Sequence, residues 1–212
     1  MYSGEFILEV TKIQDLYPKL SYDHRKFIEY FEPHEHIRHR DATEEYRIQY
    51  ACFKYAVAKV LNPETMLEIG VRFGCSALAF LNACPNMKYI GLDNERDSNV
   101  DGHNYLHFAR QSFKKYGFQA TVLVGDSQEL DVFPTVDFIH IDGCHSKECT
   151  RHDVLTAIRS CIPWILVDDS NTEDVFRGID EAIRNTELSI GYFNFPATQG
   201  GNTLLHIVET PR

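Results

Sequence analysis

The sequence predicts an α/β fold in which a doubly wound, mostly parallel sheet of about seven strands carries helices on both faces. Short apolar runs alternate with segments of helical length from residue 63 onward. The runs, such as residues 138–141, are continuously apolar, which is typical of parallel strands that are covered on both faces. The last two runs are separated by too few residues for a crossover helix, so they should pair in antiparallel fashion.

The alternation gives each element an approximate range. Strands are expected at residues 65–70, 87–92, 119–124, 135–142 and 163–168. Helices are expected between and after them at residues 75–83, 104–117, 147–160 and 173–187. Residues 189–195 and 203–209 should form the closing C-terminal hairpin.

The residues before the first strand are expected to form a helical N-terminal cap, residues 1–62, within the same domain as a core at residues 63–212. Asp41 and Glu44 match a capping box, which predicts a helix that runs to about Leu61 and stops at Pro63. One face of that helix should carry the apolar residues Tyr46, Tyr50, Phe53, Val57 and Val60.

Composition excludes several classes of protein. The 212 residues are 43% hydrophobic, which is enough for one full core, and the net charge is −10. A dedicated nucleic-acid binder would need a basic face, so we expect no nucleic-acid partner. No apolar run is long enough to span a membrane, and the first residues do not resemble a signal peptide. Six cysteines without framework spacing indicate reduced thiols and a cytoplasmic protein.

Residues 66–76 combine a buried strand, a glycine turn and the start of a helix. Gly70 and Gly74 would let the backbone approach a ligand closely. Asp93 ends the next strand, where a carboxylate is well placed to bind the two hydroxyls of a ribose. The pattern therefore predicts a cofactor that contains a nucleoside.

The glycine spacing narrows the choice of cofactor. The central glycine of G-x-G-x-x-G and the Gly-Lys-Ser/Thr of a P-loop are both absent. Instead, Glu68-x-Gly70-x-x-x-Gly74, then Asp93 and then Gly125-Asp-Ser127, resembles the class I S-adenosylmethionine-dependent methyltransferases over residues 60–208. Small bacterial members also carry motifs similar to residues 141–145, Ile-Asp-Gly-x-His, and 167–169, Val-Asp-Asp.

This resemblance implies a Rossmann-like core and S-adenosyl-L-methionine as cofactor. The implied cofactor-binding residues are Glu68, Gly70, Gly74, Ser76, Asp93, Asp126, Ser127 and Asp142. The glycines and Ser76 would contact the methionine part, Asp93 the ribose, and Asp126 with Ser127 the adenine edge. Two departures are Arg72-Phe73, which fills the turn, and Cys144, which stands where the family usually has Asp.

Three acids, Asp142, Asp168 and Asp169, follow the fourth and fifth strands and should meet at the carboxyl edge of the sheet. Crowded carboxylates repel one another, and a hard divalent cation relieves that repulsion. The pattern resembles the metal-dependent O-methyltransferases of the catechol type, which implies Mg²⁺ bound by these three acids. The alternative is that Asp168 or Asp169 caps the next helix while Asp142 binds the cofactor amine.

His145 and Asp142 are the candidate catalytic residues. A histidine just past a strand end is suited to act as general base, although a structural hydrogen bond explains it almost equally well. His140 is expected to be a satisfied, semi-buried histidine. An iron site of His140, Asp142 and His145 would be unusual on an α/β fold, and the spacing of Cys144, His145, Cys149 and His152 matches no known zinc motif.

The predicted reaction is methyl transfer to a hydroxyl of a small molecule such as a sugar, a phenol or a natural product. The acceptor should lie between the ends of strands four and five, the loop of residues 191–202 and the N-terminal cap. Two alternatives remain open at this stage, an NAD-dependent oxidoreductase and a non-catalytic nucleoside-binding module. Small enzymes of this kind often form homodimers, and no membrane partner is expected.

Overall fold

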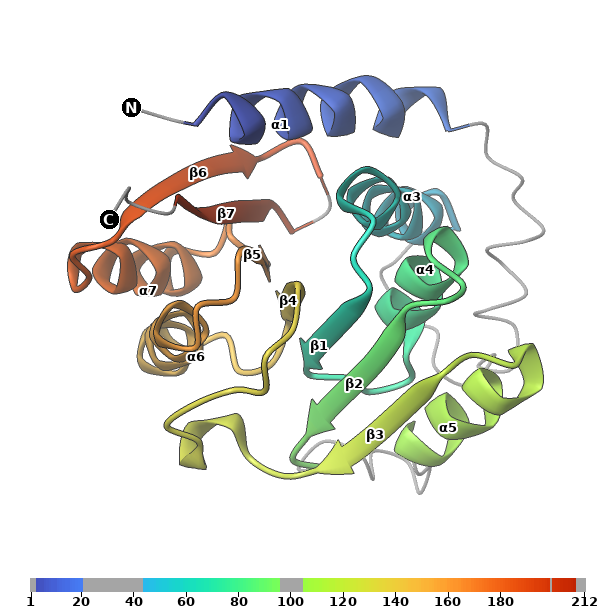
Figure 1. The fold of residues 1–212 in the computed structure, drawn as a ribbon. Helices are drawn as coiled ribbons and strands as arrows, with labels where there is room; N and C mark the ends of the chain where they lie inside the picture. Colours follow the sequence, from blue (N-terminus) through green and yellow to red (C-terminus); the bar gives the residue numbers. More distant parts are fainter. Residues whose placement is uncertain (1–2, 21–43, 96–104, 199, 209–212) are drawn as a thin grey trace.

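A seven-stranded sheet in the order β3-β2-β1-β4-β5-β7-β6 organises the computed structural model, which describes residues 3–20, 44–95, 105–198 and 200–208 (Figure 1). The strands are β1 (Thr65–Ile69), β2 (Lys88–Asp93), β3 (Ala120–Val124), β4 (Phe138–Ile141), β5 (Trp164–Asp168), β6 (Ser189–Phe195) and β7 (Asn202–Val208). The first five strands run parallel, and β7 pairs antiparallel with both β5 and β6. The predicted fold class and its C-terminal hairpin are confirmed.

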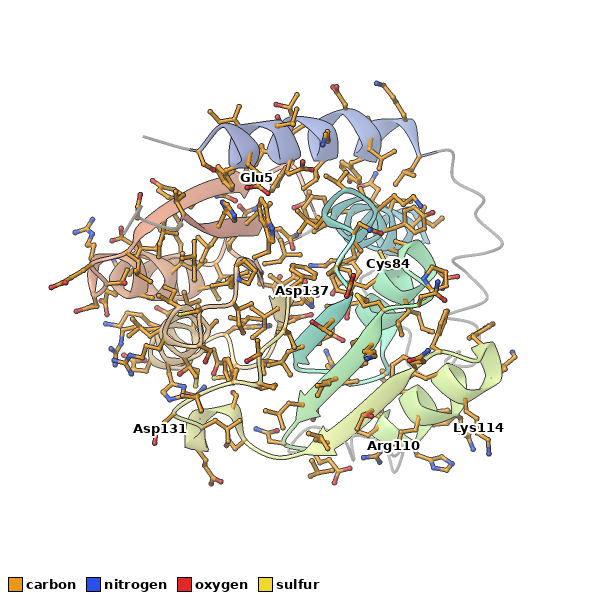
Figure 2. All side chains as sticks on the ribbon, viewed as in Figure 1. Glu5, Cys84, Arg110, Lys114, Asp131 and Asp137 are labelled. Atoms are coloured by element: carbon orange, nitrogen blue, oxygen red, sulfur yellow. The ribbon has the colours of Figure 1, made fainter. Side chains whose placement is uncertain are left out.

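Helices cover both faces of this sheet. They are α1 (Gly4–Leu16), α3 (Glu44–Leu61), α4 (Cys75–Ala83), α5 (Tyr105–Tyr116), α6 (Lys147–Arg159) and α7 (Glu173–Arg184), with short 3-10 turns η1 (Tyr17–Lys19) and η4 (Ser127–Glu129). One apolar core lies under α1, α3, α4 and α5, and a second lies under α6 and α7. Side chains fill the space on each side of the strands (Figure 2). Among the described helices, none is long and apolar enough to cross a membrane.

Some predicted boundaries differ from those observed. β4 begins at Phe138 rather than near residue 135, because the Asp137 carboxylate accepts hydrogen bonds from the backbone N–H groups of Glu64 and Thr65 and ends the preceding loop there. α7 ends at Arg184, three residues early, because Asn185 caps its last carbonyls. The predicted capping residue Asp41 lies outside the described residues.

The face predicted for α3 omits a lysine that the structure buries. Phe53 and Val57 are buried as expected, but Lys54 is buried too, with an exposed fraction of 0%, where it contacts β4, β5 and β7. α1 lies across β6, β7 and α3 (Figure 1), and its Phe6 ring stacks against Trp164 and His206. Packing on both sides explains why α3 carries more than one buried stripe.

Strand register brings the ends of the parallel strands together. Ile69 of β1 lies opposite Leu92 of β2 and Ile141 of β4, and Ile141 lies opposite Val167 of β5. The residues that follow these positions therefore line one edge. Gly70 lies there at a φ of +85°, and a Cβ on it would overlap the carbonyl oxygen of Asp142.

Replacing Gly70 by alanine should destabilise the protein by about 3 kcal/mol or more, because the new methyl group adds a backbone clash to left-handed strain. Urea unfolding would measure the change. Gly117→Ala is the matched control, since Gly117 also has a positive φ of +73° but a Cβ there would have no other atom within 4 Å. Equal losses in the two variants would contradict the close approach to Asp142.

Candidate functional site

The turn between β1 and α4 is held by Asp93 at the end of β2. One carboxylate oxygen, Oδ2, accepts hydrogen bonds from the backbone N–H groups of Val71 and Arg72, both at 2.9 Å. The other, Oδ1, accepts from the N–H of Glu95 at 2.8 Å. Sequence reasoning expected Asp93 to bind a ribose. In the structure Asp93 also holds the backbone of the turn. Its oxygens can accept further hydrogen bonds, so ribose binding stays a prediction.

The helix after this turn begins where a ligand could approach. Gly74 is the residue before α4 and has a φ of +75°, and its missing side chain leaves room for the Phe113 ring. The first turn of a helix generally leaves N–H groups without a carbonyl partner inside the helix, and such groups together with the helix dipole suit a carboxylate or phosphate. Gly70 and Gly74 thus flank the turn between β1 and α4, as the sequence predicted.

Glu68 and Ser76, two further predicted cofactor residues, contact each other in the core. Glu68 is fully buried, and its Oε1 accepts a hydrogen bond from the Ser76 hydroxyl at 2.5 Å. The Tyr89 hydroxyl donates to Oε2, and His140 Nδ1 lies 2.8 Å from Oε1. Their direct contact with a cofactor therefore stays a prediction, while a role in fixing the turn from below is visible.

His140 continues this buried chain toward a lysine that sequence analysis missed. Lys54 Nζ lies 3.0 Å from His140 Nε2, 2.9 Å from Asp168 Oδ2 and 2.6 Å from Asn202 Oδ1. An ammonium group only donates, so His140 Nε2 accepts, and Nδ1 carries the proton that is donated to Glu68. His140 is satisfied, as expected, and fully buried. Spacing could have revealed Lys54, which follows Tyr50 by four residues along the apolar face.

Asp168 is the buried member of the predicted acid trio. Burial alone would raise the pKa of this carboxyl group, but the Lys54 ammonium holds that pKa well below its usual range. Its Oδ1 accepts from the N–H of Asp169 at 3.0 Å, so both oxygens have protein partners. Asp168 therefore differs from the other two acids in being buried and paired with a lysine.

Asp142 and Asp169 come together with His145 at the partly exposed surface of the same edge. His145 Nε2 lies 3.5 Å from Asp142 Oδ1 and 3.3 Å from Asp169 Oδ2. The Tyr50 hydroxyl donates to Asp142 Oδ2 at 3.1 Å, and burial and the charge of Asp142 raise the pKa of Tyr50, which keeps it a donor. Burial and the two neighbouring acids raise the pKa of Asp169.

Two sets of side chains could hold a metal ion among the described residues. One comprises His140, Asp142 and Asp168, and the other comprises Asp142, His145 and Asp169, each with donor atoms within 4.8 Å of one another. Lys54 already binds two members of the first set. The second set offers two carboxylate oxygens and an imidazole nitrogen, which is a suitable donor set for a divalent cation.

Asp126 and Ser127 follow β3, at the far end of the same edge. Asp126 caps the η4 turn by accepting a hydrogen bond from the N–H of Gln128 at 3.0 Å, and Ser127 is buried. Because β3, β2, β1 and β4 are consecutive neighbours, Asp126, Asp93, Gly70 and Asp142 follow one another along the edge. Gln128 also donates to the buried Asp153, whose pKa is raised to about 6 by burial and which the sequence did not single out.

A hollow of about 310 Å³ lies between the N-terminal helix, α3 and the β6–β7 loop. Its walls are largely apolar, and they are formed by Ile13, Gln14, Tyr17, Pro18, Phe53 and residues 193–198. Thr198 accepts a hydrogen bond at 3.0 Å from Asn202, the residue that also binds Lys54. The hollow therefore adjoins the buried network at the end of β5.

Comparison with known proteins agrees with this architecture. Residues 67–170 match the methyltransferase domain family. A methyltransferase of Podospora anserina, PaMTH1, solved with S-adenosylhomocysteine, is 18% identical and matches 99% of this chain and 98% of its own, with a TM-score of 0.66. No curated protein matches the sequence.

Two further solved structures are O-methyltransferases. TomG of Streptomyces achromogenes, solved with S-adenosylmethionine, is 12% identical, and the match covers 88% of this chain and 89% of TomG, with a TM-score of 0.58. An O-methyltransferase of Bacillus cereus, solved with S-adenosylhomocysteine, is 14% identical and covers 87% of this chain and 90% of its own, with a TM-score of 0.58. At these identities the structural likeness concerns the fold.

His145 should titrate far above an ordinary histidine. Its hydrogen bond to Asp142 and the charges of both acids outweigh burial and raise its pKa to about 9. Since the folded pKa exceeds the unfolded value of about 6.5, the protonated His145 stabilises the fold fully below pH ~6.5, and this stabilisation is lost as the pH rises through about 9. An NMR titration of the cation-free protein would measure the pKa, and Asp142→Asn should lower it. A wild-type midpoint near 6.5 would contradict the observed cluster.

Proposed function

Because the chain belongs to the class I S-adenosylmethionine-dependent methyltransferases, we propose that it transfers a methyl group to a hydroxyl oxygen of a small molecule. The observation that carries this proposal is the cluster of Asp142, His145 and Asp169 beside the glycine turn. Two carboxylates and an imidazole at this edge suit the deprotonation and orientation of a hydroxyl group. The O-methyltransferase neighbours support the same class of acceptor.

The residues along the edge fit an extended nucleoside cofactor. S-adenosylmethionine supplies, when bound, a methyl group on a sulfonium that departs as a neutral thioether. The N–H groups at the start of α4 would bind its carboxylate, Asp142 its amino group, Asp93 the ribose hydroxyls, and Asp126 with Ser127 the adenine edge. The Glu68–Ser76 pair would hold the turn in position from below.

The donor set also fits a divalent cation, such as the Mg²⁺ expected from the sequence. Asp142 Oδ1 and Asp169 Oδ2 are partly exposed oxygens that face a common neighbour, His145. A cation bound there would lower the pKa of an acceptor hydroxyl. The acids would orient the acceptor, and His145 would receive its proton when Nε2 does not bind the cation. Asp168 is not included in this set, because it is buried and its oxygens already accept hydrogen bonds from Lys54 and the backbone.

The acceptor is proposed to place an apolar or aromatic part in the 310 Å³ hollow. Its walls come from the N-terminal helix and the β6–β7 loop, two of the segments between which sequence analysis placed the acceptor, whereas the ends of β4 and β5 do not line it. Rings such as Phe53 and Phe193 favour a flat apolar group over a fully hydrated sugar. A phenol or a natural product with a ring beside its hydroxyl is therefore the preferred class. Six free thiols support the proposed cytoplasmic location.

The first test is calorimetric titration of the protein with S-adenosylmethionine, S-adenosylhomocysteine and NAD, each with and without Mg²⁺, followed by a screen of hydroxylated small molecules. Binding of both sulfur nucleosides without NAD, and then methylation of a phenolic acceptor, is the expected result. Asp142→Asn should abolish turnover, because it removes a charge from both the amine-binding and the cation-binding positions. Full turnover by this variant in a chelator would contradict the proposed site.

The acceptor hollow is tested by Phe193→Ala. Loss of this ring should raise the acceptor KM about tenfold, the equivalent of one partly buried aromatic contact, and leave S-adenosylmethionine binding unchanged. Tyr192→Ala is the control, because Tyr192 is the adjacent residue on β6, is 46% exposed and does not line the hollow. If Tyr192→Ala raises the KM as much as Phe193→Ala, the acceptor does not use this hollow.

A further inference from the structure

Two possible metal sites overlap at the edge of the sheet and share Asp142. One adds the buried His140 and Asp168, and the other adds the partly exposed His145 and Asp169. We propose that Lys54 is a positioning residue that closes the first site, so that a divalent cation is held by Asp142, Asp169 and His145. The inference rests on the proposed function for the presence of a cation, and it assigns the residues that select and bind it.

The ammonium of Lys54 occupies the first site. Its Nζ lies 3.0 Å from His140 Nε2 and 2.9 Å from Asp168 Oδ2, which are the donor atoms that a cation would need. Lys54 is also bound to Asn202 Oδ1 at 2.6 Å, and its exposed fraction is 0%. An ammonium that is buried and held by three acceptors places a positive charge among these atoms. A second cation on the same atoms would be repelled by it.

Asp168 is therefore already engaged by donors of the protein itself. Oδ2 binds Lys54, and Oδ1 accepts from the N–H of Asp169. Only 3% of the Asp168 side chain is exposed, compared with 34% for Asp169 and 23% for Asp142. A cation arriving from solvent would reach Asp142 and Asp169 and not Asp168.

The second site is shaped for a cation. Tyr50 binds Asp142 Oδ2, which leaves Oδ1 beside His145 Nε2 at 3.5 Å. Asp169 Oδ2 approaches the same nitrogen at 3.3 Å, so a cation would replace a proton among three converging donors. An imidazole nitrogen in the set favours Mn²⁺ over Mg²⁺, which prefers oxygen ligands.

Cation binding by the purified protein, without cofactor or acceptor, tests the assignment. Calorimetry with Mn²⁺ and with Mg²⁺ should show tighter binding of Mn²⁺ by the wild type. Asp169→Asn and His145→Gln should each weaken Mn²⁺ binding about tenfold or more. The double variant Lys54→Met/Asp168→Asn, which removes the buried ammonium together with the carboxylate that it pairs with, should bind Mn²⁺ as the wild type does. If it loses as much affinity as Asp169→Asn, then Asp168 is a ligand and the proposal is wrong.

Lys54→Met alone opens the first site and should strengthen Mg²⁺ binding about tenfold, because it frees a carboxylate oxygen. Lys59→Met is the matched control, since Lys59 is an exposed lysine on the same helix and its loss changes the net charge equally. If the two variants change the Mg²⁺ affinity equally, the effect of Lys54→Met comes from the net charge alone, and the role assigned to Lys54 is wrong. Circular dichroism would verify that each variant is folded.

A spectroscopic measurement on the wild type makes the test independent of any Lys54 variant. Electron spin echo spectroscopy of bound Mn²⁺ should show nitrogen coupling that disappears in His145→Gln, and absence of this coupling in the wild type would overturn the assignment. Mn²⁺ binding with nitrogen coupling but without methylation of any acceptor would contradict only the proposed function. No Mn²⁺ binding at all would overturn this inference while leaving cation-free methyl transfer possible.

Discussion

The buried contact between the Lys54 ammonium and the Asp168 carboxylate is the interaction on which the arrangement of the sheet edge depends. Two of the carboxylates that are buried among the described residues, Glu68 and Asp168, belong to this hydrogen-bonded network, and burial of a charge is strongly unfavourable unless it is paired and hydrogen-bonded. Lys54 supplies the opposite charge and reaches β5, β4 and β7 through Asp168, His140 and Asn202. Helix α3 is thereby tied to the strands whose ends form the site.

The same network fixes the glycine turn from beneath. From Lys54 it passes through His140 to Glu68, which in turn receives the hydroxyls of Ser76 and Tyr89. Each of these groups lies on a different strand or helix, so the network fixes the positions of β1, β2, β4 and α4 relative to one another. Because every polar group has a partner, the network can be both buried and rigid. Within this network, the motif residues Glu68 and Ser76 support the glycine turn.

The edge consequently has two layers with different chemistry. The buried layer, with His140 and Asp168, is saturated by the protein's own donors, while Asp142, His145 and Asp169 above it retain exposed atoms. Asp168 and Asp169 show how one strand end can serve both layers, since the first side chain points into the core and the second, at a φ of +52°, lies at the surface. Two acids that are adjacent in sequence thus differ, since Asp168 is buried and paired with Lys54 whereas Asp169 is partly exposed.

The sequence by itself determined the parallel sheet, its closing hairpin and the edge at which the acids meet, because apolar periodicity and strand ends are local properties. It also identified Gly70, Asp142 and His145 as neighbours, since parallel strands end on the same side. Only the tertiary structure decided that Lys54 is buried and that Asp168 is committed to it. That pairing joins residues 114 positions apart, and no local pattern reports which carboxylate a distant ammonium will reach.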